Sequence, residues 1–131
     1  IDDHAIVGGL VAIHQHARIG AYCIIGGSSA VSKDIPPYVL AVGNRAHLLG
    51  LNRVGLRRGG FSREEINEIK AAYNRLFKRG MGLSDAVASL QEESDNSVHV
   101  SNFLDFISES KREITKERLK IKHDHIDEKS M

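Results

Sequence analysis

The chain has 131 residues, enough for one domain or two small ones. Its 18 basic and 17 acidic side chains nearly balance, which argues against general nucleic-acid binding, because that function usually needs a strongly basic stripe. The single cysteine, Cys23, excludes an internal disulfide and fits a reducing compartment. With no signal peptide and no apolar stretch of the roughly 20 residues that cross a bilayer, we expect a cytoplasmic protein without a transmembrane segment.

A six-residue repeat runs from residue 1 to residue 36. An aliphatic side chain opens every hexapeptide, and a glycine stands second in three of them, at positions 8, 20 and 26. The opening residues are Ile1, Val7, Ile13, Ile19, Ile25 and Val31. A period of six fits neither an α-helix, with its period of 3.6, nor a two-sided strand, with its period of two. The repeat therefore indicates a parallel β-helix.

Each hexapeptide is interpreted as a short strand followed by a corner. The opening aliphatic residue points inward, the glycine lets the backbone turn, and the small fifth residue fits inside the bend. Cys23 occupies such a fifth place, so it is expected to be a core residue and not a nucleophile. Pro36 and Pro37 end the repeat, and residues 38–42 form one more strand. The β-helix is expected over residues 1–44.

Residues 45–60 form a connector rich in Leu, Gly and Arg, and residues 61–111 are expected to be helical. Ser62 and Glu65 have the spacing of a capping box, after which apolar residues recur at helical spacing. Two further helices are expected, one starting at Ser84 and one over residues 97–111. Residues 112–131 are mostly charged and are expected to form a polar tail, either disordered or extending the third helix.

Three histidines fall within the repeat, at positions 4, 14 and 16, and in the repeat frame all three face outward. Their spacing is not that of a structural zinc site, and His123-Asp124-His125 in the tail is a weak metal motif, so no metal is expected. Arg57 and Arg58, next to two glycines and just before a helix, suit phosphate recognition. They equally suit a solvated surface, and no dinucleotide or P-loop pattern accompanies them, so no cofactor is expected.

The longer motifs resemble a known family. The coils ending in DIPPYVLAVGN are similar to hexapeptide-repeat acyltransferases in general. The continuation GLNRVGLRRGGFSREEI, followed by AYNRLF, resembles the UDP-N-acetylglucosamine O-acyltransferases of lipid A synthesis, over roughly residues 1–107. The resemblance implies a homotrimer of left-handed β-helices, with three hexapeptides per coil and a C-terminal helical domain. Because the repeat is already running at Ile1, the chain is expected to be the C-terminal portion of a longer protein.

The resemblance also implies the first step of lipid A synthesis: transfer of an (R)-3-hydroxyacyl group from acyl carrier protein to the 3-hydroxyl of UDP-N-acetylglucosamine. A histidine general base in a coil before Ile1 would serve this step, so the chain alone is expected to contain no catalytic residue and to be inactive.

Five positions match the family's substrate-binding residues. His14 and Gln15 match the pair that lines the sugar-nucleotide site, which lies between subunits. Asn52 and Arg58 match residues that contact the UDP part, with Arg58 at the phosphates, and Gly27 matches the glycine that sets acyl-chain length.

The chain departs from the family pattern at three positions: Val54 replaces an acidic residue, Gly59 a second arginine and Arg45 a histidine. Two other functions stay open on the sequence. One is a hexapeptide-repeat acyltransferase acting on a different sugar nucleotide. The other is a non-catalytic trimerisation module, because two coils bury little core and leave an unpaired edge.

Overall fold

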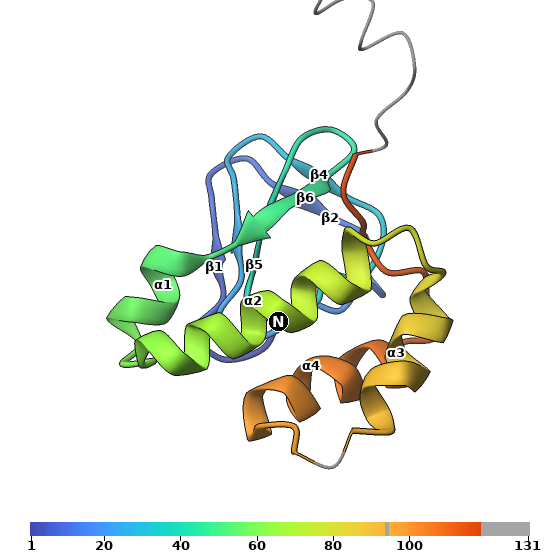
Figure 1. The fold of residues 1–131 in the computed structure, drawn as a ribbon. Coiled ribbons are helices and arrows are strands. Elements are labelled where there is room, and N and C mark those ends of the chain that lie inside the picture. The colour runs from blue at the N-terminus through green and yellow to red at the C-terminus, as the bar shows by residue number, and fades with distance from the viewer. Residues whose placement is uncertain (94, 119–131) are drawn as a thin grey trace, which may run out of the picture.

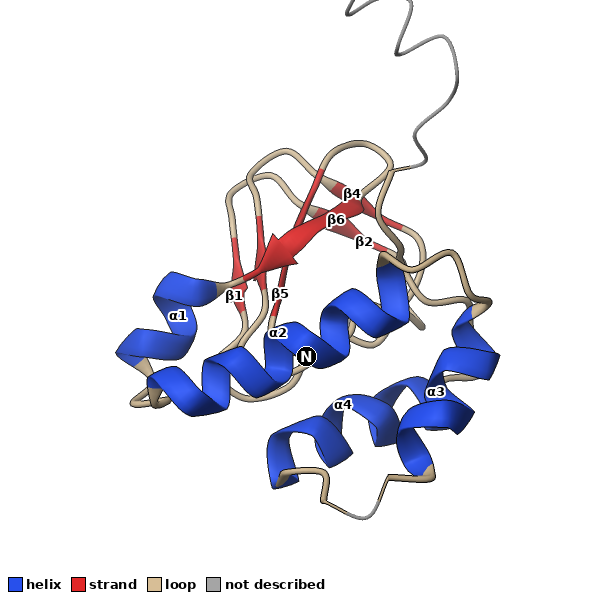
Figure 2. Cartoon of the chain, in the orientation of Figure 1, coloured by secondary structure: helices blue, strands red, loops and turns tan. Residues whose placement is uncertain are grey.

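The computed structural model describes residues 1–93 and 95–118. In the described part of the chain, short stacked strands lie on one side and helices on the other, and the long helix α2 (Arg63–Phe77) passes along the strands (Figures 1 and 2). α2 contacts strand β6 (His47–Leu51) as well as helices α3 (Leu83–Gln91) and α4 (Val98–Glu109). Within the described residues, no helix is long and apolar enough to cross a membrane. The weak metal motif at positions 123–125 lies outside these residues.

The strands stack in parallel, as the repeat predicts. They are β1 (Ile6–Val7), β2 (Ala12–Ile13), β3 (Ile24–Ile25), β4 (Ala30–Val31) and β5 (Val39–Val42). Ile6 pairs with Ile24 and Ala12 pairs with Ala30, so one coil takes eighteen residues, or three hexapeptides. β5 stacks on β3, and β6 (His47–Leu51) then pairs antiparallel with β5.

The predicted inward residues become more buried along the repeat. Ile19, Ile25 and Val31 are at most 4% exposed, whereas Ile1 is 77% exposed. The reason is that, among the described residues, no coil covers the outer side of the first one. Cys23 is fully buried, and burial raises the pKa of its thiol to about 12, so it is a core residue as predicted.

The repeat glycines have a different role from the predicted one. Gly8, Gly20 and Gly26 do not have a positive φ; the left-handed conformation falls two places later, at the fourth residue of a hexapeptide. His4, Leu10, Tyr22 and Ser28 adopt it. A Cβ on Gly20 would lie 2.3 Å from the nitrogen of Pro37, and one on Gly8 would lie 2.7 Å from the nitrogen of Gly27. These glycines therefore permit neighbouring coils to approach, rather than turning the backbone.

The three predicted helices are present. They are α2 (Arg63–Phe77), α3 (Leu83–Gln91) and α4 (Val98–Glu109). Ser62 Oγ accepts from the Glu65 amide at 3.1 Å and Glu65 Oε1 accepts from the Ser62 amide at 2.8 Å, which completes the predicted capping box. The connector of residues 45–60, by contrast, is itself ordered into β6 and a short helix, α1 (Arg53–Arg58), which the sequence did not predict.

An aromatic cluster joins the helices to the coils. The ring of Phe61 lies 4.9 Å from Tyr22, 6.1 Å from Tyr38 and 4.5 Å from His99, measured between ring centroids. His99 Nε2 is also 2.7 Å from Glu65 Oε2. The Ser62 amide and His99 together lower the pKa of the Glu65 carboxyl. The start of α2 is thus bound both to α4 and to the β-helix.

Residues 112–118 return to the coils. The Asp34 amide donates to the Glu113 carbonyl at 2.9 Å, the Thr115 amide donates to the Asp34 carbonyl at 2.8 Å, and Ile114 is buried. The Tyr73 hydroxyl donates to Glu117 Oε2 at 2.5 Å. This strap (residues 112–118) is therefore packed against the fold, unlike the polar tail predicted from residue 112. The rest of that predicted tail, residues 119–131, lies outside the described residues.

The stacking role of the glycines predicts unequal effects of two alanine substitutions. Gly20→Ala should lower the free energy of unfolding by about 3 kcal/mol, because its Cβ would collide with the backbone of Pro37. Gly9→Ala should change it by less than about 0.5 kcal/mol, because no atom lies within 4 Å of the added Cβ. Chemical denaturation measures both. Equal losses of unfolding free energy in the two variants would contradict the role of Gly20 in the close approach of the coils.

Candidate functional site

A cavity of about 340 Å³ lies between the first two coils and helix α1. Ile6 and Ile24 contribute apolar surface, and His4 and Tyr22 contribute aromatic rings. From the other side, Asn52, Arg58 and Gly59 line it. The cavity thus combines apolar and aromatic surface from the coils with polar groups from α1.

Asn52 fixes helix α1 to the β-helix. Its Oδ1 caps the helix by accepting from the Gly55 amide at 3.2 Å, and its Nδ2 donates to the Tyr22 carbonyl at 2.9 Å. The residue is only 8% exposed. Gly55 has no room for a side chain, because a Cβ would lie 2.2 Å from Asn52 Nδ2. The side chain of Asn52 therefore positions helix α1 against the coils. The family resemblance, which assigns Asn52 to UDP binding, did not indicate this role.

Arg58 is an exposed residue of the last turn of α1 and lines the cavity. Within the described residues its guanidinium forms no ion pair, so it is available to an anionic group. Its neighbour Arg57 lines a different cavity, together with Arg53 and Arg63. The two adjacent arginines therefore serve separate surfaces.

Gly59 follows Arg58 and lies against the ring of Tyr22. A Cβ at Gly59 would be 2.7 Å from Tyr22 Cε1. A side chain at position 59 therefore cannot coexist with this position of Tyr22. The glycine at position 59 and the aromatic ring at position 22 therefore form one local arrangement.

His14 and Gln15 lie elsewhere, at the exposed corner that follows β2. The His16 amide donates to His14 Nδ1 at 3.2 Å, so His14 carries its hydrogen on Nε2 when the ring is neutral. Gly27 is also exposed and lies away from the cavity. Of the predicted site residues, the single chain thus brings together Asn52 and Arg58 but not His14, Gln15 or Gly27. His4 and Tyr22 had not been assigned to this site.

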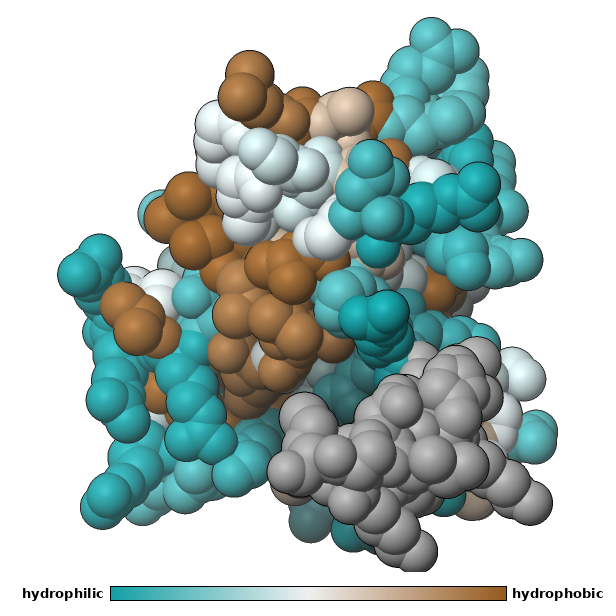
Figure 3. Space-filling model, turned by 90° about the horizontal axis from the view of Figure 1, so that it is seen from above, coloured by the Kyte–Doolittle hydropathy of each residue, from teal (hydrophilic) through white to brown (hydrophobic). Residues whose placement is uncertain are grey.

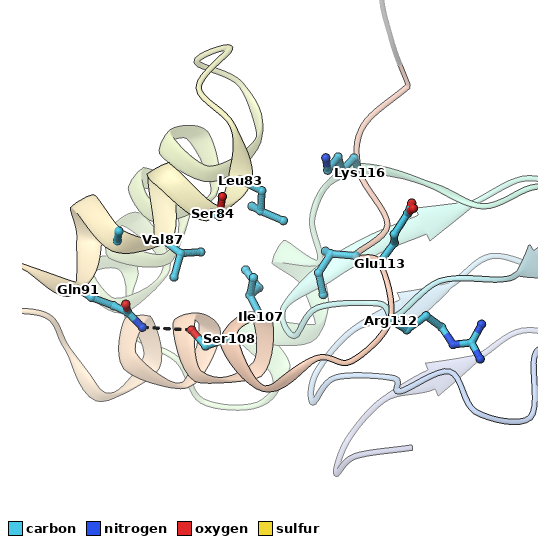
Figure 4. A pocket seen from close by; sticks show the side chains of 11 residues that line it. Leu83, Ser84, Val87, Gln91, Ile107, Ser108, Arg112, Glu113 and Lys116 are labelled. Carbon is cyan, nitrogen blue, oxygen red and sulfur yellow. Dashed lines mark hydrogen bonds between the residues drawn. The ribbon is translucent and has the colours of Figure 1, made fainter.

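A second cavity, of about 460 Å³, lies between α3, α4 and the strap (Figure 4). Its lining includes Leu83, Val87 and Ile107, and the Gln91 amide donates to the Ser108 hydroxyl across it at 3.1 Å (Figure 4). None of the predicted site residues lines it. Across residues 1–93 and 95–118, no group of three or more His, Cys, Asp or Glu side chains is placed to hold a metal ion.

The family model described as UDP N-acetylglucosamine O-acyltransferase, domain 2, matches residues 34–115, which include α1 and its cavity-lining residues. The chain belongs to the UDP-N-acetylglucosamine O-acyltransferase family. The resemblance seen in the GLNRVGLRRGGFSREEI motif is thereby confirmed.

Relatives within this family agree in sequence and in structure. The acyl-[acyl-carrier-protein]–UDP-N-acetylglucosamine O-acyltransferase of Myxococcus xanthus is 43% identical over 116 residues, covering 88% of this chain and 45% of the relative. The Nautilia profundicola protein of the same name is 44% identical over 118 residues, covering 90% and 45%. The chain thus spans less than half the length of these UDP-N-acetylglucosamine O-acyltransferases.

Solved structures of the family superpose on the chain. The UDP-N-acetylglucosamine acyltransferase of Campylobacter jejuni matches with a TM-score of 0.79 and 42% identity, covering 88% of this chain and 45% of that one. The Francisella novicida enzyme matches with a TM-score of 0.83 and 32% identity, covering 88% and 43%. Both the coils and the helices of this chain fall within matches of this extent.

The contacts of Asn52 predict a loss of stability when it is replaced. Asn52→Ala should lower the free energy of unfolding by about 1–3 kcal/mol, because it removes a helix cap and leaves the Tyr22 carbonyl without a donor. Asn52→Asp keeps the capping oxygen but turns a second carboxylate oxygen toward the Tyr22 carbonyl, so it should not restore the stability. Thermal or chemical denaturation tests this, and an Asn52→Ala protein as stable as the parent would refute the positioning role.

Proposed function

We propose that this chain takes part in the transfer of an (R)-3-hydroxyacyl group from acyl carrier protein to the 3-hydroxyl of UDP-N-acetylglucosamine, the first step of lipid A synthesis. The observation that supports it most is the cavity beside α1. There Arg58, matched to a phosphate-contacting residue of the family, lies free of ion pairs within the described residues. A guanidinium binds phosphate oxygens through charge-assisted, often bidentate hydrogen bonds.

In the proposed reaction the sugar hydroxyl attacks the thioester carbonyl carbon, a C–O bond forms, and the C–S bond to the carrier protein breaks. The proton of the hydroxyl passes to a histidine base, which the resemblance assigns to a coil before Ile1, and from there to the departing thiolate of the carrier protein. The contribution of this chain is therefore binding. Arg58 holds the diphosphate and Asn52 holds the helix that carries Arg58.

The remaining site residues fit the proposal if a neighbouring copy of the chain completes the site. His14 and Gln15 lie outside the Arg58 cavity, so we propose that they line it from an adjacent subunit of a homotrimer of left-handed β-helices. Gly27 would then limit the acyl chain, and the protein would work in the cytoplasm, where the acyl carrier protein is available.

Exposed apolar side chains support an assembly of this kind. Large hydrophobic residues are exposed on the coils and on α1, and a contiguous hydrophobic area is open on the face shown in Figure 3. Leaving out Ile1, Ile6 and Val7, which lie on the first coil with its uncovered outer side, these exposed residues are Leu10 at a coil corner, Leu49 in β6 and Val54 in α1. A contiguous apolar area on a surface is typical of a contact with another chain.

The assembly is tested by light scattering of the whole protein at micromolar concentration. The proposal expects the mass of a trimer. A stable monomer would contradict it, because the His14 corner and the Arg58 cavity would then have no means of meeting.

The binding role of Arg58 is tested by Arg58→Ala in the whole protein. Affinity for UDP-N-acetylglucosamine should fall roughly tenfold to a hundredfold, since a charge-assisted contact is worth about 1.5–3 kcal/mol. Stability should change by less than about 0.5 kcal/mol, because the residue is exposed.

The neighbouring substitution Arg57→Ala provides the control, because Arg57 lies on the same helix but lines another cavity. It should leave the affinity for UDP-N-acetylglucosamine, measured by calorimetry, within about twofold of the parent. Equal effects of the two substitutions, or none from Arg58→Ala, would contradict the proposed site.

A further inference from the structure

The cavity of about 460 Å³ between α3, α4 and the strap has aliphatic walls (Figure 4). Leu83 and Val87 come from α3, Ile107 comes from α4 and Ile114 comes from the strap. The last three of these side chains are at most 9% exposed. Pockets that bind small molecules have volumes of roughly 300–1,000 Å³ and are lined mainly by apolar side chains. The cavity therefore has the size and the lining of a binding site for an apolar group.

All walls of this cavity come from the C-terminal half of the chain. Every lining residue falls between positions 83 and 116, and none belongs to the coils. The uncovered first coil therefore has no part in its shape. The polar lining residues Gln91 and Ser108 bind each other, because the Gln91 amide donates to the Ser108 hydroxyl at 3.1 Å.

Among the described residues, one cation of the lining has no partner. Figure 4 shows Lys116 extending from the strap toward α3, and its ammonium forms no ion pair within the described part of the chain. By contrast, the Arg112 guanidinium donates to the Ser32 carbonyl at 3.5 Å. The Glu113 carboxylate pairs with Lys33 Nζ at 3.0 Å. A ligand in this cavity thus meets aliphatic surface and a single ammonium group.

These two features select one class of ligand. Leucine, valine and isoleucine side chains offer no ring on which a planar aromatic ligand could stack, whereas they suit a hydrocarbon chain, which gains free energy with each methylene that is buried. A phosphate is best bound by a guanidinium fork or several donors, whereas one ammonium is a point charge that suits a single carboxylate. A long-chain carboxylate satisfies both features.

We propose that this cavity binds a free fatty acid, with the hydrocarbon chain between α3, α4 and the strap and the carboxylate at Lys116. The bound chain fills the space that separates α3 from the strap. The proposal goes beyond the proposed function and does not rest on it, because no residue of the Arg58 cavity lines this one.

The first measurement is calorimetry of the whole protein with octanoate, decanoate and dodecanoate. Affinity should rise about tenfold for every two methylenes added, because each buried methylene contributes to binding. A series of equal affinities would overturn the proposal, because the chain would then lie outside the cavity.

The carboxylate position is tested with Lys116→Glu, which replaces attraction by repulsion. Decanoate should bind about tenfold more weakly at low ionic strength, whereas the uncharged 1-decanol should bind within twofold of the parent. Lys111→Glu is the matched control, because Lys111 is also exposed but lines a different cavity. It should change neither affinity by more than about twofold.

The chain position is tested with Val87→Thr, which keeps the shape of the side chain and adds a hydroxyl to the wall. Decanoate and 1-decanol should both bind about fivefold more weakly, because the chain would cover an unpaired polar group. Val98→Thr is the control, because Val98 is 67% exposed on α4 and lies outside the cavity lining. It should leave both affinities unchanged.

Decanoate affinity that is unchanged in both Lys116→Glu and Val87→Thr would overturn the proposal, because the fatty acid would then bind elsewhere. Decanoate binding that appears only after removal of residues 119–131 would also overturn it, and would assign the cavity to that segment. Neither result affects the proposed function, which the Arg58→Ala measurement tests separately. Lys116 is exposed, so Lys116→Glu keeps the proposal testable if Val87→Thr fails to fold.

Discussion

The eighteen-residue register between stacked coils is the constraint on which the rest of the structure depends. It is maintained by parallel backbone pairing, as between Ile6 and Ile24, and by glycines such as Gly20 that have no room for a side chain. The same register that aligns aliphatic residues inside the coil aligns His4 with Tyr22 outside it. Core packing and the candidate site are therefore set by one repeat, since a shift of register would separate both sets of partners.

The helices add to this scaffold at a few well-defined contacts. Asn52 binds α1 to a coil carbonyl, Phe61 packs its ring among aromatic residues of the coils and α4, and the strap pairs its backbone with Asp34. Helix α1 is only six residues long, so its position rests on these contacts and not on its intrinsic stability. The cavity exists because α1 is held beside the first two coils.

The sequence predicted those features that depend on local pattern. The repeat gave the parallel coils, and the capping box of Ser62 and Glu65 located the start of α2. It did not predict α1, whose short stretch with Gly55 lacks a helical period, or the strap, whose order comes from backbone bonds to Asp34 that charged side chains do not reveal. The local sequence pattern also could not predict contacts between residues far apart in the sequence, such as those that bury Asn52.

Of the candidate site, the family motif gave Arg58, whereas the stacked rings of His4 and Tyr22 in the same cavity required the three-dimensional register. The central claim is that the cavity between the coils and α1 binds the nucleotide. A crystal structure of the whole protein with UDP-N-acetylglucosamine tests it most directly. We expect diphosphate oxygens within hydrogen-bonding distance of the Arg58 guanidinium. A sugar nucleotide bound elsewhere, with the Arg58 side chain in solvent, would contradict this claim.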